Sequence, residues 1–255
     1  MKVAAAEITL GEIVSKDYRA ATFFERYGLD YCCGGKRSVA EACRAKGVDP
    51  AIVLADLERL DEGGATLTAP DYESCGPERI IDHIVTCHHA FVRAALPRLT
   101  TLLVKLCEVH GARHPELHNV ARHFGHLRQE LESHLLKEEE VLFPYIRALA
   151  QASRDKTAPP SNIFGTVRNP IRMMEAEHQG AGNELILIHE LTGGHRAPTD
   201  GCATYQTAMR ELAAFERDLF LHIHLENNIL FRKAIALEAE VAADNSGTLR
   251  FRALE

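Results

Sequence analysis

Two stretches of the chain carry the same pair of metal-binding residue types, a histidine followed four residues later by a glutamate. In SHLLKEEEVLF the pair is His134 and Glu138. In LHIHLENNILF it is His222 and Glu226, and each member lies 88 residues after its counterpart. Residues four apart on a helix project from one face with Cβ atoms about 5–6 Å apart. Each pair therefore presents an imidazole nitrogen and a carboxylate oxygen to one site.

These polar residues occupy positions that are otherwise apolar. They alternate with hydrophobic residues in steps of four and three, as core positions of a left-handed helix bundle do. An uncompensated carboxylate in an apolar interior is costly, so two carboxylates beside imidazoles predict mutual pairing or a bound metal. The three series are Leu127, Leu131, His134, Glu138, Val141 and Tyr145; Ile171, Met174, His178, Ala181, Leu185 and Ile188; and Leu212, Phe215, Leu219, His222, Glu226 and Ile229.

A fourth histidine is expected from the first long helical stretch, where the periodicity admits two residues. His89 fits one apolar series and His88 fits another. His178 lies 44 residues before His222. His89 lies 45 residues before His134, so the internal repeat favours His89. The predicted set contains four imidazoles and two carboxylates.

One metal ion rarely binds six such side chains. Two ions, each bound by two histidines and bridged by Glu138 and Glu226, use every donor and balance the charge. With one solvent-derived bridge, about one coordination position per ion stays open to a small molecule. These donors suit iron, manganese or zinc alike. In the alternative interpretation no metal binds: the histidines pair with helix carbonyls or glutamates, and the repeat records a duplicated helical hairpin.

The elements that position these residues are helices. Helical periodicity extends over nearly the whole chain, without a run of alternating β-branched residues. Long helices are predicted at 78–106, 117–149, 169–191 and 203–240. Four antiparallel helices of this kind form a bundle with ligands in its core. The predicted fold is all-α, with an up-down four-helix bundle.

The chain is predicted to divide into a small N-terminal helical module at 1–62, a linker at 63–77, the bundle at 78–240 and a frayed C-terminal tail at 241–255. The linker is rich in Gly, Pro and small polar residues. In the module, Ser38-Val39-Ala40-Glu41 has the spacing of a capping box, which places a helix start at Ser38.

Composition limits the classes of function. The chain has 255 residues, 46% of them hydrophobic, and a net charge of −7. Nucleic acid is not expected as a partner, because contacts to phosphates require clustered Lys and Arg. No membrane span and no secretory signal are predicted, so we expect a cytoplasmic protein with its seven cysteines reduced. A homodimer is compatible with the sequence, which does not specify the oligomeric state.

Several motifs together resemble a known family. The bundle resembles a hemerythrin-like domain, and its combination with the N-terminal cysteines resembles the di-iron repair-of-iron-centres proteins, which respond to nitrosative and oxidative stress. The resemblance runs from about residue 7 to residue 235. The motifs that carry it are YCCGGK, IIDHIVTCHH, SHLLKEEEVLFP, MMEAEH and HIHLENNILF.

This resemblance implies two iron ions in a non-haem, carboxylate-bridged di-iron centre with an oxo or hydroxo bridge. The bridging carboxylates fall on Glu138 and Glu226. Glu177, beside His178, matches a family glutamate near the centre, although an exposed helix residue is the alternative. Carried over position by position, the ligands are His89, His134, Glu138, His178, His222 and Glu226.

The chain also departs from the family pattern at two positions. The family has an aromatic residue at the position of His88 and a small polar residue at the position of His224. Because the predicted set of ligands is already complete, we expect both imidazoles to lie beside the ligands rather than on the metal.

Cys32 and Cys33 form a vicinal pair that requires its own interpretation. A disulfide between them would be strained, because neighbouring Cα atoms lie about 3.8 Å apart. The predicted helix start at Ser38 and the charge of Lys36 both favour thiolates. The pair could bind iron transiently, react with nitric oxide or exchange disulfides. Buried turn cysteines are the alternative.

The leading functional hypothesis is repair of iron–sulfur clusters damaged by nitrosative or oxidative stress. Damaged iron–sulfur proteins and nitric oxide, or another small diatomic ligand, are the expected partners. The centre would donate iron to the clusters or bind and reduce nitric oxide, and the sequence leaves both open. The alternatives are a non-catalytic hemerythrin-like sensor or carrier of oxygen or nitric oxide, and a structural or storage metal bundle. The symmetric ligand set and the Cys-Cys module count against a sensor.

Overall fold

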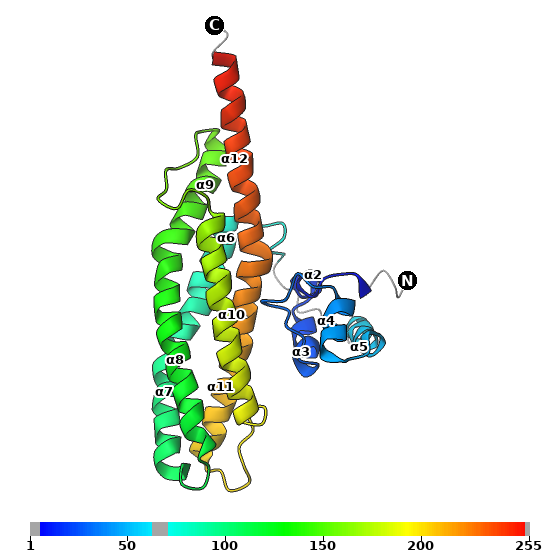
Figure 1. The fold of residues 1–255 in the computed structure, drawn as a ribbon, viewed down its shortest axis with the longest axis vertical. Helices are drawn as coiled ribbons and strands as arrows, with labels where there is room; N and C mark the ends of the chain where they lie inside the picture. Colours follow the sequence, from blue (N-terminus) through cyan, green and yellow to red (C-terminus); the bar gives the residue numbers. More distant parts are fainter. Residues whose placement is uncertain (1–5, 63–70, 253–255) are drawn as a thin grey trace. The chain divides into compact units, whose positions relative to one another are not determined.

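The computed structural model describes residues 6–62 and 71–252, most of which lie in helices (Figure 1). Within these ranges there is no β-strand, only an isolated bridge between Thr9 and Ser38. The predicted all-α fold is confirmed. None of the helices in the described ranges has the length and hydropathy of a membrane span.

Backbone contacts divide the chain into two units. One comprises Asp82–Tyr145 and Phe164–His222, and the other comprises Met1–Ile81, Ile146–Ile163 and Ile223–Glu255. The helical runs 116–155 and 203–252 continue through these boundaries without a break.

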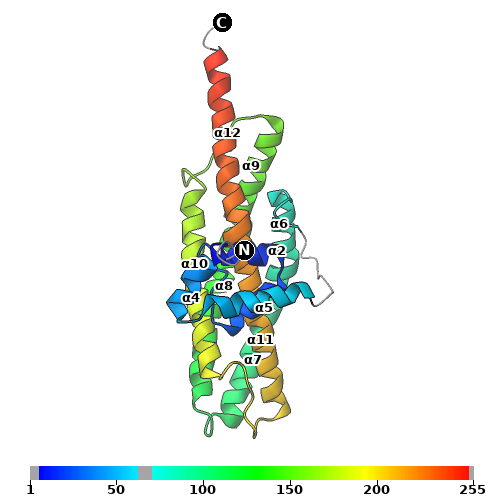
Figure 2. The same ribbon diagram turned by 90° about the vertical axis from the view of Figure 1, so that its right-hand side faces the viewer.

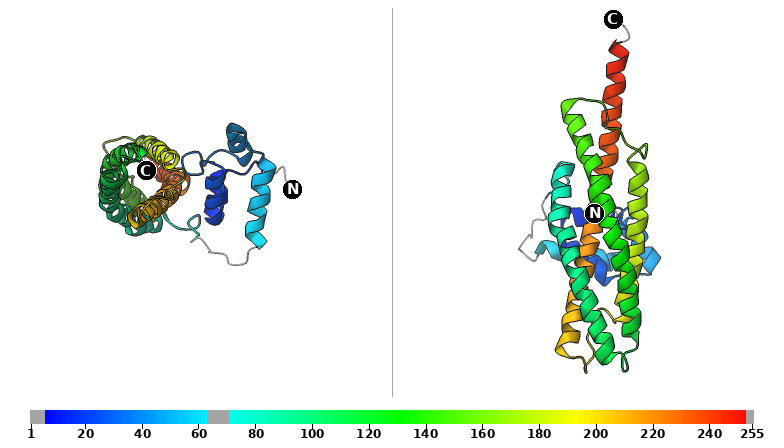
Figure 3. Two further views of the ribbon diagram at one scale, coloured as in Figure 1. Left: turned by 90° about the horizontal axis from the view of Figure 1, so that it is seen from below. Right: turned by 90° about the vertical axis from the view of Figure 1, so that its left-hand side faces the viewer.

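The first of these units is the predicted up-down four-helix bundle. Its helices run side by side around a common axis, as the end-on view of Figure 3 shows. They are α7 (Ala90–His110), α8 (Glu116–Lys137), α10 (Arg168–Leu191) and α11 (Ala203–His224). Fully burying one large aliphatic or aromatic side chain stabilises a fold by about 1.5–3 kcal/mol. The buried apolar residues of the core include Val92, Leu96, Leu99, Leu103, Val120, Phe124, Leu127, Leu131, Met174, Leu185, Ile188, Leu212, Phe215 and Leu219.

Within residues 6–62 and 71–252, three π-helical turns interrupt the helical runs, and the helical periodicity of the sequence does not indicate them. They are η1 (Ile84–His89), η2 (Glu138–Leu142) and η3 (Leu225–Leu230). A π turn inserts an extra residue into a helix and rotates the following residues around its axis, and it is frequent at functional sites. Each of these turns contains or adjoins a residue of the predicted metal set.

The π turn η2 explains one wrong prediction. Val141 was expected in the core, yet it is 45% exposed, whereas Leu142 is 1% exposed. The prediction assumed the ordinary period of 3.6 residues per turn, and the wider turn from Glu138 replaces Val141 by Leu142 on the buried face.

The remaining elements of the two long runs are α6 (Pro77–His83), α9 (Phe143–Asp155) and α12 (Phe231–Arg252). Helix α12 continues to Arg252, beyond Glu240, where the sequence predicted the start of a frayed tail. Apolar periodicity, from which the tail was predicted, indicates a packing partner rather than helicity itself. Residues such as Ala, Glu and Leu remain helical without one because of their intrinsic propensity.

The N-terminal helices are short, and two of them begin at capping boxes. They are α2 (Leu10–Lys16), α3 (Arg19–Arg26), α4 (Val39–Lys46) and α5 (Pro50–Glu62), of which α4 and α5 face the viewer in Figure 2. Ser38 caps α4 with Glu41 as the reciprocal partner, so the predicted capping box is confirmed. Of the predicted linker, residues 63–70 lie outside the described residues.

Candidate metal centre

The six residues predicted as ligands all lie in the protein interior. None exposes more than 3% of its surface, although four are imidazoles and two are carboxylates. Isolated charges in such a place are unstable, so the group requires internal pairing or bound cations. The residues are His89, His134, Glu138, His178, His222 and Glu226.

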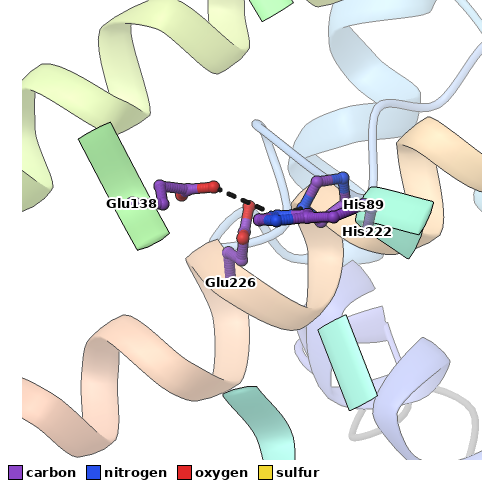
Figure 4. Close-up of side chains that lie close together, drawn as sticks. All are labelled: His89, Glu138, His222 and Glu226. Atoms are coloured by element: carbon purple, nitrogen blue, oxygen red, sulfur yellow. Dashed lines mark hydrogen bonds and ion pairs between the residues drawn. The ribbon is translucent and has the colours of Figure 1, made fainter. Parts of the chain in front are cut away.

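The donor atoms form two groups of four, within each of which all atoms lie within 4.8 Å of one another. One group adds His89 and His222 to the two glutamates, and Figure 4 shows their side chains turned toward one another. The other adds His134 and His178 to Glu138 and Glu226. Both carboxylates therefore belong to both groups.

The distances between donors are those of neighbouring ligands on one ion. The Nε2 atoms of His134 and His178 are 3.0 Å apart, and those of His89 and His222 are 3.1 Å apart. Two donors at about 2.1 Å from an ion and about 90° apart are separated by about 3.0 Å. Glu138 Oε2 lies 3.3 Å from His134 Nε2 and 3.4 Å from His89 Nε2, so it lies near both groups.

Glu177 determines which nitrogen of His134 is available to a metal. His134 Nδ1 lies 2.8 Å from Glu177 Oε2, and Lys137 Nζ bonds to the other oxygen. The hydrogen bond from His134, opposed by burial and helped by Lys137, lowers the pKa of Glu177 to about 2. An ionised carboxylate accepts a proton at Nδ1, which leaves the lone pair of His134 on Nε2, directed into the donor group.

The opposite group has the same construction, through residues that the sequence analysis missed. His89 Nδ1 lies 2.5 Å from Glu139 Oε1, which also accepts from Arg93 Nη1 at 2.8 Å. Burial raises the pKa of Glu139, but the hydrogen bonds from Arg93 and His89 outweigh it and lower that pKa overall. No sequence signal separated Glu139 from its neighbours Glu138 and Glu140, because only the π turn decides which side each one faces.

Neither of the two additional histidines belongs to a donor group. His88 lies against a predicted ligand, as expected, whereas His224 contacts Asn228, Ser15 and Tyr31. The ring of His88 stacks on His222, with centroids 5.5 Å apart, and its Nδ1 lies 3.0 Å from Asp218 Oδ1. His224 accepts a hydrogen bond from Asn228 at Nδ1 (3.1 Å), and its Nε2 lies 3.3 Å from Ser15 Oγ. Burial lowers the pKa of His224 to about 4.

Asp30 organises the vicinal cysteines. Its Oδ1 accepts the backbone N–H groups of Cys32 and Cys33 at 3.1 and 2.9 Å. The same oxygen accepts the Cys32 thiol at 3.2 Å, and the two sulfurs are 3.8 Å apart as free thiols. The three side chains form a further cluster with metal-binding atom types.

The expectation that the helix start and Lys36 make both cysteines thiolates is wrong for Cys32. The hydrogen bond with Cys33, the burial of the sulfur and the nearby Asp30 carboxylate all raise the pKa of Cys32. Negative charge beside a buried sulfur disfavours the thiolate, and this local effect exceeds that of a helix that begins only at Val39.

The Cys-Cys segment contacts the residues that directly follow Glu226. Asn227 and Asn228 donate to the backbone oxygen of Cys32 at 3.4 and 3.1 Å. Asn228 also donates to the backbone oxygen of Tyr31, at 3.2 Å. A Cβ atom on Gly35 would lie 2.5 Å from Asn228 Oδ1, so the close approach requires glycine there.

These donor sets fit transition-metal ions. Imidazole and carboxylate ligands suit iron, manganese or zinc, and the buried carboxylates require positive charge beside them. Sequence reasoning identified every donor of the two groups. It missed Glu139, Arg93 and Lys137, which orient the histidines or hold the carboxylates that do so.

Most of the chain matches two known protein families. Residues 79–234 match the family described as the hemerythrin HHE cation binding domain. Residues 6–61 match the ScdA_N family, described as a domain of unknown function (DUF542).

Individual relatives match both segments together. The chain is 35% identical over 229 residues to the iron-sulfur cluster repair protein YtfE of Escherichia coli O157:H7, which covers 90% of this chain and 97% of the relative. The protein of the same name from Citrobacter koseri has the same identity and coverage. That of Escherichia coli O17:K52:H18 is 34% identical over the same share of each chain.

Proposed function

This chain belongs to the family of iron–sulfur cluster repair proteins with a hemerythrin-type cation-binding domain, and on that basis we propose that it repairs damaged clusters at a di-iron centre. The clusters it serves are those damaged by nitrosative or oxidative stress. The two donor groups would hold one iron ion each, and an oxo or hydroxo bridge would complete the centre.

The observation that carries this proposal is that Glu138 and Glu226 belong to both groups of donor atoms. A carboxylate has two oxygens, so one glutamate can ligate two ions at once. His89 and His222 complete one ion's ligands, and the corresponding pair on α8 and α10 completes the other's. A single buried ion would leave one pair of imidazoles without a function.

The surrounding residues prepare this site for metal. Glu177 and Glu139 each hold a proton on Nδ1 of a histidine, so that Nε2 bears the lone pair toward the ion. The apolar core excludes bulk water from the donors. Iron bound there supplies electrons and open coordination positions for a small molecule such as nitric oxide. In this proposal Glu177 is a positioning residue, and it acts through His134.

We propose the same domain division as the sequence predicts: an N-terminal module at 1–62, a linker at 63–77, the bundle at 78–240 and a tail at 241–255. The N-terminal module supplies the thiols of Cys32 and Cys33. The pair accepts iron leaving the centre, or passes electrons to it. The contact of Asn227 and Asn228 with the Cys32 backbone supports this role, because both asparagines follow Glu226 directly.

Damaged iron–sulfur proteins are the partners in this proposal, and nitric oxide is the small ligand. Reduction of nitric oxide is an enzymatic activity of the same open positions, alongside donation of iron. All seven cysteines are free thiols, which suits the cytoplasm.

The first test is metal content after purification without oxygen. We expect about two iron ions per chain in the wild type, and loss of both in Glu138→Ala with Glu226→Ala. The matched control replaces two exposed glutamates of the bundle, Glu130→Ala with Glu190→Ala, and keeps the iron. Zinc, a single ion, or iron retained by the first variant would contradict the di-iron centre.

The second test separates the thiols from the centre. The Cys32→Ser with Cys33→Ser variant should retain bundle iron yet fail to reactivate an iron–sulfur protein damaged by nitric oxide. The Cys75→Ser variant serves as the control. If iron and repair disappear together, or neither changes, the relay role of the pair is wrong.

A third measurement distinguishes repair chemistry from the sensor or carrier alternative. The diferrous protein is exposed to excess nitric oxide, and nitrous oxide is measured in the gas phase. A sensor binds nitric oxide in a fixed ratio and forms no nitrous oxide. A protein that reduces nitric oxide forms one nitrous oxide and one water from two nitric oxide molecules, with two electrons from the diferrous centre and two protons from solvent.

A further inference from the structure

A separate cluster of donor atoms lies where α10 connects to α11. Both imidazoles of this cluster face the same carboxylate, that of Glu216. His189 Nδ1 lies 3.0 Å from Glu216 Oε1, and His195 Nε2 lies 2.9 Å from Glu216 Oε2. The donor atoms of all three residues lie within 4.8 Å of one another.

The hydrogen bonds of Thr192 identify the nitrogen of His195 that bears a proton. Thr192 Oγ1 lies 2.8 Å from the carbonyl oxygen of Ile188, which can only accept, so the hydroxyl proton lies between these two atoms. Thr192 Oγ1 is also 3.2 Å from His195 Nδ1. The hydroxyl therefore accepts at this contact, and His195 Nδ1 carries the proton.

This assignment has a consequence at the other nitrogen. A neutral His195 protonated at Nδ1 presents the lone pair of Nε2 to Glu216 Oε2, only 2.9 Å away. Two lone pairs at this distance repel each other, and a cation between them removes the repulsion. That cation is either a proton, which makes the ring an imidazolium, or a metal ion.

The local backbone holds His195 at this place. His195 has φ of 55°, which is uncommon for a residue with a Cβ, and it follows Gly193 and Gly194 with φ of 58° and 80°. The side chain of His195 is 3% exposed and that of Glu216 is 13% exposed. His189 is 51% exposed, so the cluster is accessible from solvent on its side.

We propose that His189, His195 and Glu216 bind a divalent transition-metal ion at a second site, distinct from the buried centre. Two imidazole nitrogens and one carboxylate form the ligand set of open zinc and ferrous sites. Thr192 fixes the tautomer of His195, as hydrogen-bond acceptors do for histidines that bind metals. His189 lies 11 residues after His178 on α10, about 16 Å along the helix axis, so the two sites share no ligand.

Metal binding at this site is an exchange of cations. The ion replaces the proton held between His195 Nε2 and Glu216, and that proton passes to solvent. Water molecules complete the coordination of the ion. No electron is transferred.

The test uses full-length protein whose buried centre has been filled with iron without oxygen, and Co²⁺ as the visible probe. We expect one further equivalent of Co²⁺ with d–d absorption, and release of about one proton in weakly buffered solution. Glu216→Gln and His195→Gln should each weaken Co²⁺ binding by more than about 100-fold, because each removes a ligand. Zn²⁺ or Fe²⁺ should displace the cobalt, and the better competitor identifies the ion.

Two further variants make the test specific. Thr192→Val removes only the hydroxyl and should weaken Co²⁺ binding by about 10–100-fold. The control is His123→Gln, because His123 also pairs with a glutamate, Glu184, at 2.7 Å. The second imidazole near Glu184, that of His126, is 4.0 Å away, and within the described residues these three do not form a group of donors within 4.8 Å of one another. This control should bind Co²⁺ as the wild type does.

If one of these variants fails to fold, His189→Gln provides the test, because the side chain of His189 is half exposed. We expect this variant to bind Co²⁺ more than tenfold more weakly than the wild type. Circular dichroism and the iron content of the buried centre monitor folding. The proposal is overturned if no cobalt binds beyond that centre, if Glu216→Gln and His189→Gln bind it normally, or if neither Zn²⁺ nor Fe²⁺ displaces it. None of these results affects the proposed repair function, which depends on other ligands.

Discussion

His134 Nδ1 lies 2.8 Å from Glu177 Oε2, and this contact directs the other nitrogen of the ring toward His178. The same relationship joins His89 to Glu139. In each case the carboxylate is also held by a cationic side chain, Lys137 or Arg93. The two donor groups are therefore supported symmetrically.

Replacing Glu177 should loosen iron without removing a ligand. Glu177→Ala removes the acceptor for His134 Nδ1, and iron retention against a chelator should fall by about 10–100-fold. Glu177→Gln keeps a carbonyl acceptor and should retain iron better than Glu177→Ala does. The exposed residue Glu190 on the same helix is the control, as Glu190→Gln. Equal iron retention in the alanine variant and the wild type would contradict the positioning role.

The π turn η2 makes a prediction about stability. Leu142→Ala should lower the free energy of unfolding by about 2–5 kcal/mol, because it opens a cavity in the core. Val141→Ala, at an exposed position, should change it by less than about 0.5 kcal/mol. Chemical denaturation of both variants at equal metal loading measures the difference. A larger loss in Val141→Ala than in Leu142→Ala would indicate that Val141 is the buried residue, as the sequence predicted.

Gly35 and Gly125 should respond to alanine with opposite signs. A Cβ atom on Gly35 would lie 2.4 Å from Tyr31 O, so Gly35→Ala should destabilise the protein by about 1–3 kcal/mol. Gly125 lies inside α8, and apart from its chain neighbours and the backbone of its own helix no atom lies within 4 Å of its Cβ position. Gly125→Ala should stabilise the protein by about 0.5–1 kcal/mol. Thermal unfolding of the two variants compares them, and a Gly35→Ala protein as stable as the wild type would contradict the clash with Tyr31 O.

Cys202 should be the most reactive thiol near neutral pH. His110 Nε2 lies 3.2 Å from its sulfur. The hydrogen bond with His110 and the backbone N–H groups of Tyr205 and Thr204 lower the pKa of Cys202 from 9.0 to about 7. Because the thiolate is the nucleophile, the rate of alkylation should rise with pH and reach half its maximum near pH 7.

The role of His110 can be isolated by substitution. His110→Gln should move the midpoint of alkylation upward and slow the reaction at pH 7 by about tenfold or more. His114→Gln is the control, since His114 pairs with Asp200 instead. Labelling with iodoacetamide, followed by mass spectrometry, assigns the reacting cysteine. A wild-type midpoint near pH 9 would contradict the effect of His110.

Much of the candidate site was visible in the sequence because it is encoded by local spacing. His134 with Glu138, and His222 with Glu226, are each one turn apart on a helix, and helix geometry alone places them on one face. The capping box at Ser38 is equally local. Residue types and intervals are sufficient for such features.

The sequence could not reveal what depends on contacts between elements. Leu142 is buried in place of the predicted Val141, because a π turn changes the register of the residues that follow it. The packing of the bundle determines where such a turn occurs. The environment of Cys32 likewise depends on Asp30 and on burial, which together outweighed the helix start and Lys36.

The sequence by itself determined the donor atoms of the buried centre, because its ligands repeat at helical intervals within an apolar pattern. Only the tertiary structure decided that His189 and His195 converge on the carboxylate of Glu216, and that Glu139 orients His89. These residues come from different helices and from a left-handed turn. The physical reason is that periodicity reports which face of a helix a side chain occupies, whereas packing decides which other side chains it meets.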